Sequence, residues 1–219
     1  MAEILLYRRK LTAPINGSNL SADEHERAAR LRFADARQRF IAARATLRAV
    51  LGQHTGIAPD RLVFATGAFG KPVLAGLENP PHFNLSHSGD LVLIAIADRP
   101  VGVDVETRRP LDSMAQMIDL AFTDTERAAL ASLNGADRSA AFFDLWTRKE
   151  AVTKARGDGF RLVKTFSLPV GGPAGTQAAV SLDESVYLVR TVMIGADYAA
   201  AVALEAHADE TLDLQLRVG

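Results

Sequence analysis

Cysteine is absent from the chain, so there is neither a disulfide framework nor a thiolate nucleophile. Long apolar runs are absent too: the longest, LVLIAIA at residues 91–97, is far shorter than the roughly 20 residues that a membrane-spanning helix needs. Near the start of the chain, basic side chains follow a short apolar run instead of preceding it, and no small-residue cleavage site follows. We therefore expect a cytoplasmic protein without an export signal.

Aromatic residues and net charge are also scarce, with one tryptophan, three tyrosines and a formal net charge of −1. This composition offers neither a stacking platform nor a basic surface for nucleic acid. Any anionic ligand must therefore be bound by a local group of cations. Hydrophobic residues make up 48% of the 219 residues and charged ones 23%, which is ordinary for a soluble protein of one large or two small domains.

The first half of the chain predicts a strand, two helical stretches and further short strands. A strand at residues 3–9 leads to Ser21 and Glu24, which have the spacing of a capping box. The helix that they open is interrupted near Phe33 and resumes over residues 35–52, before Gly56 and Pro59 end it. Short strands are expected at residues 62–65, 91–97 and 101–106.

The second half repeats this order of elements. Thr123 and Glu126 form a second capping box, a longer helix covers residues 139–156, and strands at 186–194 and 198–204 form a hairpin. The capping boxes and the glycines that end the long helices recur at nearly equal spacing, which indicates an internal duplication. We expect an α+β fold with an N-terminal subdomain at residues 1–99 and a C-terminal subdomain at residues 100–219.

Period-two alternation marks the segment VGVDVE, residues 101–106, as a strand. Its valines share one face, while Asp104 and Glu106 share the other, about 6.6 Å apart by the rise of a strand. Like charges on one face repel each other, and a bound hard cation would relieve that repulsion. A solvated edge of a sheet is the alternative interpretation of this acid pair.

The best candidate for a third acid is Glu150, in the segment LWTRKEAVTKARG. Trp146, Glu150 and Lys154 recur every four residues and therefore share one stripe of a helix. Oxygen ligands without cysteine or nearby histidine favour Mg²⁺ or Mn²⁺ over zinc. The alternative for Glu150 and Lys154 is an ordinary surface ion pair.

Cations accompany these acids at several places. Lys149 and Lys154 flank Glu150, and Lys71 precedes Pro72 in a tight turn that could present an ammonium to a phosphate. In the segment FNLSHSGD, residues 83–90, a short extended piece ends in a loop that can present Ser86 and His87 to a phosphate, although a plain hairpin turn would use the same residue types. Further cations that could bind an anion lie along the first helices: Arg27, Arg30 and Arg44. The alternative is that these arginines form a solvated helix face.

Taken together and in order, GKP, FNLSHS, VGVDVE and WTRKEAVTK resemble the signature of 4′-phosphopantetheinyl transferases of the surfactin-synthetase type. The spacing between Asp104 and Trp146 also lies within the gap of that family. The resemblance implies a pseudo-dimer of two similar α/β halves that binds coenzyme A in the cleft between them. It also implies the reaction, which moves the phosphopantetheine arm of coenzyme A to a serine of an acyl or peptidyl carrier protein and releases adenosine 3′,5′-bisphosphate.

The resemblance further implies roles for the motif residues. Asp104, Glu106 and Glu150 would hold Mg²⁺ against the pyrophosphate, Glu150 would act as base for the carrier serine, and Lys154 would neutralise the leaving phosphate. The expected contacts of coenzyme A are Arg27, Arg44, Lys71, Pro72, Asn84, Ser86, His87, Lys149 and Lys154. A fused pseudo-dimer already has its cleft, so we expect a monomer.

The carrier would need an apolar docking surface, and the segment at residues 114–122 could supply one through Met114, Met117, Ile118, Leu120 and Phe122. Core packing of a short helix is the alternative. Two other functions are alternatives. A Mg²⁺-dependent hydrolase of coenzyme A or nucleotide diphosphates would use the same acids and lysines. A coenzyme A binding protein without catalysis would keep the cleft, but the presence of Glu150 and Lys154 argues against it.

Overall fold

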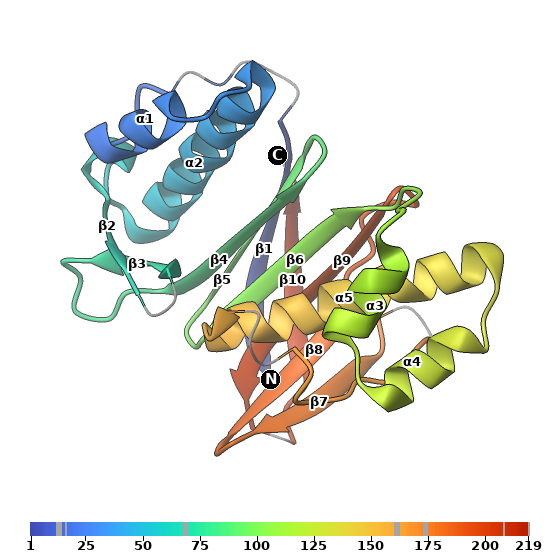
Figure 1. Cartoon of the computed structure of the whole chain (residues 1–219). Helices are drawn as coiled ribbons and strands as arrows, with labels where there is room; N and C mark the ends of the chain where they lie inside the picture. The colour runs from blue at the N-terminus through green and yellow to red at the C-terminus, as the bar shows by residue number, and fades with distance from the viewer. Residues whose placement is uncertain are drawn as a thin grey trace.

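Figure 1 shows the computed structural model of the chain, which describes residues 1–11, 15, 17–67, 70–159, 163–172, 175–207 and 209–218. Helices and strands alternate in an α+β arrangement, as the sequence predicts. The elements of the first half are β1 (Ala2–Lys10), α1 (Ala22–Ala29), α2 (Ala34–Thr55), the 3₁₀ turn η1 (Pro59–Arg61), β2 (Val63–Thr66), β3 (Pro72–Ala75), β4 (His82–Ser88) and β5 (Leu91–Ala97).

The second half repeats the pattern of one long helix and a set of strands. Its elements are β6 (Val101–Thr107), α3 (Met114–Ala121), α4 (Asp124–Ala131), α5 (Gly135–Arg156), β7 (Gln177–Leu182), β8 (Ser185–Thr191), β9 (Tyr198–Ala206) and β10 (Leu212–Val218). The long helices α2 and α5 each have 22 residues and each end at a glycine in the left-handed region, Gly56 and Gly157. Both capping boxes are confirmed. Within the described residues, no helix combines the length and the apolar character needed to cross a membrane.

The strands form two four-stranded sheets and a small hairpin. The first sheet has the order β10-β1-β5-β4, the second has the order β6-β9-β8-β7, and β2 pairs with β3. Pairing is antiparallel except between β1 and β10, which run parallel with Ala2 opposite Leu212. The last strand of the chain therefore completes the sheet of the first half, across the subdomain boundary expected at residues 99 and 100.

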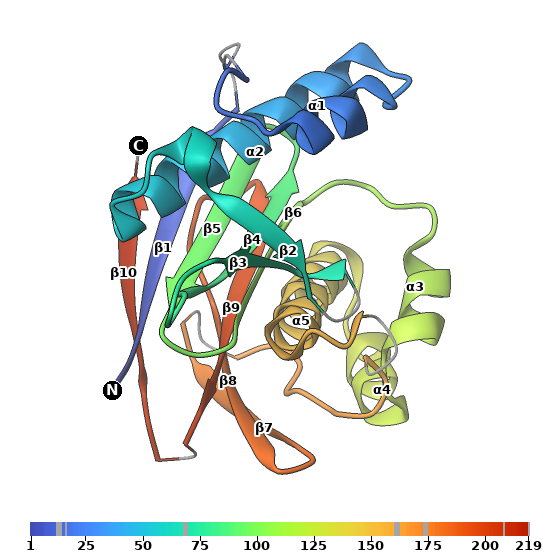
Figure 2. The same ribbon diagram turned by 90° about the vertical axis from the view of Figure 1, so that its left-hand side faces the viewer.

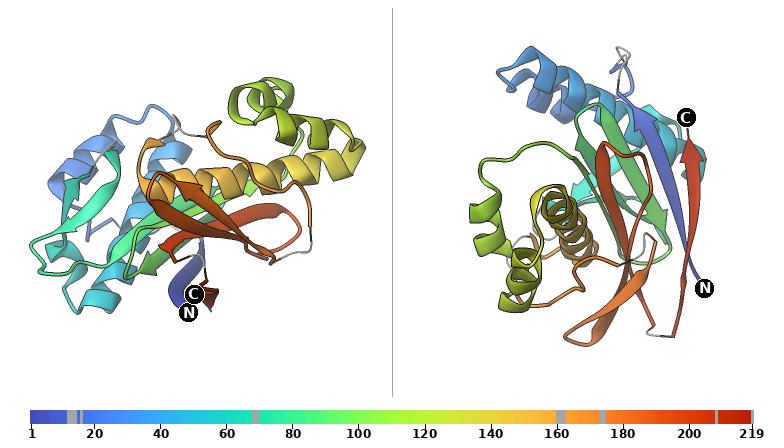
Figure 3. Two further views of the ribbon diagram at one scale, coloured as in Figure 1. Left: turned by 90° about the horizontal axis from the view of Figure 1, so that it is seen from below. Right: turned by 90° about the vertical axis from the view of Figure 1, so that its right-hand side faces the viewer.

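The layers run helix, sheet, sheet, helix (Figure 2). The strand β5 explains why: Leu91, Leu93 and Ala95 on one face pack against the second sheet, while Val92, Ile94 and Ile96 on the other pack against α2. Because both faces of β5 are covered by other elements, its sequence is a continuous apolar run. On the far side α5 lies across the second sheet, with α3 and α4 beyond it (Figure 3).

The strand β6 is apolar on one face only. Val101, Val103 and Val105 point into the core between the two sheets. The opposite face, which carries Gly102, Asp104 and Glu106, is turned toward α5. A Cβ placed on Gly102 would overlap the backbone of Ala151 and Ala155, so only glycine lets α5 lie this close to the strand.

Substitution of alanine for Gly102 is expected to destabilise the protein by about 1–3 kcal/mol, because the overlapping atoms are helix backbone and cannot change rotamer. The displaced helix would also separate Glu150 and Lys154 from Asp104. The measurement is urea unfolding. An unfolding midpoint equal to that of the wild type would show that the helix can shift at no cost.

Candidate active site

The two sheets meet where the edge strands β4 and β6 lie side by side, a contact that we call the seam. Side chains of β4 replace backbone groups in this contact and accept hydrogen bonds from alternate amides of β6. The pairs are Asn84 Oδ1 with the Val103 amide at 2.9 Å, Ser86 Oγ with the Val105 amide at 3.4 Å, and Ser88 Oγ with the Thr107 amide at 3.0 Å. The segment at residues 83–90 is extended, as expected: it is a strand as far as Ser88, and Gly89 and Asp90 form the turn.

Asp104 lies at the centre of the seam and is 3% exposed. Its Oδ1 atom accepts hydrogen bonds from Ser86 Oγ, at 2.9 Å, and from the ammonium of Lys154 on α5. Its Oδ2 atom is buried without a hydrogen-bond partner. A buried carboxylate oxygen without a partner is costly and indicates that a positively charged or hydrogen-bonding ligand belongs beside it.

Glu106 and Glu150 share the electrostatic field of Asp104. Burial raises the pKa of Glu106, the negative charge of Asp104 raises it further, and the Ser88 hydroxyl donates to Glu106 at 3.0 Å. Burial also raises the pKa of Glu150 to about 7, since the opposing effect of Lys154 is outweighed by burial together with the charges of Asp104 and Glu106. The structure thus brings the three expected acids into one electrostatically coupled group.

These acids are not assembled as a finished metal centre. Over the described ranges, no set of three acidic or imidazole side chains has the geometry of a bound metal ion. Lys154 supplies the positive charge at Asp104 instead. The donor set still suits a hard divalent cation, because it consists of carboxylate oxygens, one of them without a partner.

A pocket of about 270 Å³ opens beside this group. Residues from both halves of the chain line it: Gly70, Lys71, Pro72, Asn84, Glu150, Thr153, Lys154, Gly157 and Gly159. Five of the expected site residues are therefore neighbours around one hollow. With Lys154 and Glu150 in its lining, this hollow can bind an anionic ligand and accept a proton from a nucleophile.

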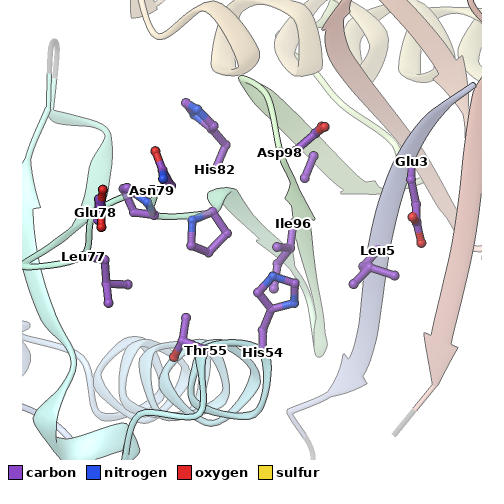
Figure 4. Close-up of a pocket in the computed structure, with 13 residues that line it drawn as sticks. Glu3, Leu5, His54, Thr55, Leu77, Glu78, Asn79, His82, Ile96 and Asp98 are labelled. Atoms are coloured by element: carbon purple, nitrogen blue, oxygen red, sulfur yellow. The ribbon is translucent and has the colours of Figure 1, made fainter.

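Figure 4 shows a larger pocket of about 800 Å³ in the first half of the chain. Its walls come from the end of α2, the start of β4 and the end of β5, and include His54, His82 and Asp98. None of the coupled acids lines it. The larger pocket is therefore separate from the candidate active site.

Two family models match adjacent parts of the sequence. The model described as 4′-phosphopantetheinyl transferase, N-terminal, covers residues 13–99, and the model of the 4′-phosphopantetheinyl transferase superfamily covers residues 100–203. The 4′-phosphopantetheinyl transferase HetI of Nostoc sp. is 38% identical over 174 residues, which are 76% of this chain and 73% of that protein. The chain belongs to the 4′-phosphopantetheinyl transferase superfamily. The resemblance seen in the sequence motifs is thereby confirmed.

Two relatives from Bacillus extend the match over more of this transferase. The 4′-phosphopantetheinyl transferase Sfp of Bacillus subtilis is 26% identical over 200 residues, 91% of this chain and 88% of that protein. The 4′-phosphopantetheinyl transferase psf-1 of Bacillus pumilus is 29% identical over 184 residues, 84% of this chain and 78% of that protein. The class of enzyme is therefore established for this chain.

Lys149 does not lie in the pocket of the transferase, although the sequence led us to expect it at coenzyme A. It is completely buried, and its ammonium donates to both carboxylate oxygens of Glu126 at 2.8 Å and to the carbonyl of Phe166 at 2.7 Å. Consecutive residues of a helix point in different directions, so Lys149 faces the core while Glu150 faces the pocket. The capping box already pointed to Glu126, but nothing in the sequence linked it to Lys149.

Ser86 and His87 were expected to act together, and the structure separates them. Because β4 alternates its side chains, Ser86 faces β6 and Asp104, whereas His87 lies on the same side as Phe83 and Leu85. The side chain of His87 is exposed, but partial desolvation lowers its pKa, and the positive charges of Lys154 and Arg39 lower it further. His87 is thus within electrostatic reach of Lys154 but does not belong to the Asp104 network.

The arginines of the first helices differ in how they are held. Arg27 is exposed, with its guanidinium 5.5 Å from the centre of the Phe40 ring. Arg30 is exposed and pairs with Glu26. Arg44 pairs with Glu24 and lies 4.8 Å from the centre of the Phe64 ring, so its guanidinium is held in place within the protein.

Sequence reasoning missed a buried arginine next to these. Arg48 is 1% exposed; it donates to Glu24 at 2.6 Å and to the carbonyls of Pro59 and Leu62 at 2.8 and 3.0 Å. Glu24 therefore joins α1 to α2 through two arginines while it also caps its own helix. The only signal in the sequence was the four-residue spacing between Arg44 and Arg48.

Proposed function

We propose that this enzyme transfers the 4′-phosphopantetheine group from coenzyme A to a serine of an acyl or peptidyl carrier protein and releases adenosine 3′,5′-bisphosphate. The observation that supports this most directly is the group at the seam, where Asp104, Glu150 and Lys154 meet beside a pocket built from both halves. Transfer to a phosphorus centre needs little more than positioned charges and one base, and this group contains both.

A divalent cation, Mg²⁺ or Mn²⁺, would be held by Asp104, Glu106 and Glu150. The fit rests on the unpartnered Oδ2 atom of Asp104 and on the raised pKa values of the two glutamates, which a nearby cation would lower. When bound, such a cation supplies positive charge against the oxygens of the pyrophosphate.

The chain's own residues divide the remaining work. A carboxylate whose pKa is about 7 suits a base at neutral pH, so Glu150 takes the proton of the carrier serine as its oxygen bonds to phosphorus. The bond from that phosphorus to the bridging oxygen of the adenosine bisphosphate breaks. Lys154, whose side chain is 30% exposed, stabilises the charge on the departing oxygen. Ser86 donates to Asp104 and holds that carboxylate in place.

The test is the intact mass of a panel of apo carrier proteins after incubation with this enzyme, coenzyme A and Mg²⁺. We expect one phosphopantetheine group to be added, and expect the addition to be lost with Asp104→Ala and with a chelator. Consumption of coenzyme A without modification of any carrier would point instead to a hydrolase. Bound, intact coenzyme A with no modified carrier would contradict catalysis and favour a binding protein.

The carrier docking surface includes α3, although the structure divides the residues that the sequence suggested. Ile118 and Phe122 are buried, and Met114 and Met117 pack partly against the core, so core packing accounts for most of the segment. Leu120 is 62% exposed. Leu120 lies on α3, in the same half of the chain as Asp104 and Glu150. Its exposed side chain is suited to contact the apolar recognition helix of a carrier protein.

Substitution of aspartate for Leu120 is expected to raise the Michaelis constant for the carrier about tenfold, because it removes apolar contact and adds a charge that repels an acidic partner. The constant for coenzyme A should not change. Steady-state kinetics with each substrate varied in turn gives both values, and the matched control is Met193→Asp at a residue that is 71% exposed. Equal increases in the Michaelis constants for the carrier and for coenzyme A would contradict docking at α3. A charged substitution at Met117 is expected to give the same result as Leu120→Asp, and equal increases there would contradict docking as well.

A further inference from the structure

Lys71 was expected to contact coenzyme A, but its ammonium is already saturated by the protein. The Nζ atom donates to the carbonyls of Lys154 at 2.6 Å, Ala155 at 3.0 Å and Val101 at 3.1 Å. A lysine ammonium has three hydrogens to donate, so these three contacts use all of them. Burial lowers the pKa of Lys71 to about 8, and the group is therefore still charged at neutral pH.

Two of the three acceptors belong to the end of α5. The last carbonyls of a helix have no partner within the helix, and the helix dipole places partial negative charge there. Gly157 donates its amide to Thr153, which satisfies one carbonyl. Lys71 satisfies the next two from outside the helix, and its aliphatic stem runs beside Gly157, at 3.6 Å from the position that a Cβ would take.

The backbone of Lys71 belongs to the first half of the chain. Its carbonyl accepts from the amide of Gly67 at 2.7 Å, and Gly70 precedes it at a φ of 84° that favours glycine. Pro72, whose ring restricts φ, follows at the start of β3. The ammonium is therefore supplied by the half of the chain that does not contain α5.

We propose that Lys71 is a positioning residue: by capping the end of α5 it fixes the helix that carries Glu150 and Lys154 against the first half of the chain. Lys71 and Pro72 of the first half line the 270 Å³ pocket together with Glu150, Lys154 and Gly157 of the second half. The contact thus holds the two parts of the pocket lining together, while the charge of Lys71 is directed at carbonyls instead of at a phosphate. The effect on activity rests on the proposed transfer reaction; the effect on the helix end does not.

The test uses Lys71→Met, which keeps the stem and removes the donors, with Lys71→Arg as the conservative variant and exposed Lys164→Met as the matched control. We expect amide hydrogen exchange in the last turn of α5 and at Gly157 to become about tenfold faster in Lys71→Met, because hydrogen bonds to a charged donor are lost. The expected kinetic effect is a fall in kcat of about tenfold or more, with the Michaelis constant for coenzyme A changed less than twofold. Lys71→Arg should retain part of the exchange protection at the end of α5 and part of the wild-type kcat.

The opposite pattern would overturn the proposal. A raised Michaelis constant for coenzyme A with unchanged kcat and unchanged exchange would show that Lys71 contacts the donor directly. Unchanged exchange and unchanged kinetics would show that the helix end does not depend on it. The exchange measurement requires no substrate, so it gives a result even if the protein proves not to transfer phosphopantetheine at all.

Discussion

Substitution of glutamine for Glu150 is expected to lower the rate of carrier modification about 100-fold to 10,000-fold, the range for loss of a general base. Glutamine has the shape of glutamate but cannot accept the proton of the carrier serine, and it removes one of the three carboxylates that would hold the cation. The measurement is single-turnover formation of holo-carrier at saturating coenzyme A, followed by intact mass.

The same variant should fold normally. Burial already disfavours the charged form of Glu150 and raises its pKa to about 7, so a neutral amide costs the folded state little. Glu184→Gln is the control, because Glu184 is exposed in the turn between β7 and β8. A Glu150→Gln enzyme within a factor of a few of the wild type would place the base elsewhere.

Substitution of methionine for Lys149 is expected to lower the free energy of unfolding by about 3–5 kcal/mol, since it leaves the buried carboxylate of Glu126 without its partner. Glu126 also accepts hydrogen bonds from the amides of Thr123 and Leu168, so α4, α5 and the segment after α5 all meet at this pair. Urea unfolding measures the loss, with Lys164→Met as control at an exposed lysine.

The double variant Lys149→Met with Glu126→Gln separates two explanations, since glutamine removes the charge but keeps a side-chain oxygen for the amides of Thr123 and Leu168. Removal of both charges should recover a large part of the stability, because the loss comes from an unpaired buried charge and not from the volume of the lysine. A Lys149→Met variant of normal stability that binds coenzyme A poorly would restore the role that the sequence motif suggested for this lysine.

Much of the fold could be predicted because many of its elements are determined by local sequence patterns. The apolar run of β5, the alternation of β6 and the two capping boxes each depend on residues close together in the chain. The strands that the sequence did not predict are β3, β7 and β10, and β4 was predicted only as a short extended piece. The strand β4 carries polar side chains because its partner at the seam is the unpaired edge of β6, and that pairing is not visible in a local pattern.

The candidate site divides in the same way. Period-two spacing placed Asp104 and Glu106 on one face of a strand, and four-residue spacing placed Glu150 and Lys154 on one face of a helix. That these two faces meet was implied by the resemblance to the family and not by either spacing. The same reasoning could not place Lys149, whose partner Glu126 lies on another helix. It also could not show that Lys71 faces the carbonyls of α5, because the end of a helix in one half and a turn in the other become neighbours only after both halves pack.

The parallel pairing of β1 with β10 has a consequence for how the chain folds as it is synthesised. The strand that begins the chain is flanked by β5 on one side and by β10 on the other. The first half can build α2 and the β4–β5 hairpin early, but one edge of β1 stays open until residues 212–218 have left the ribosome. Contacts between such distant parts of the sequence form slowly, and an open edge of this kind can pair with other chains. We therefore expect aggregation and chaperone binding to involve mainly the nascent first half, before β10 pairs with β1.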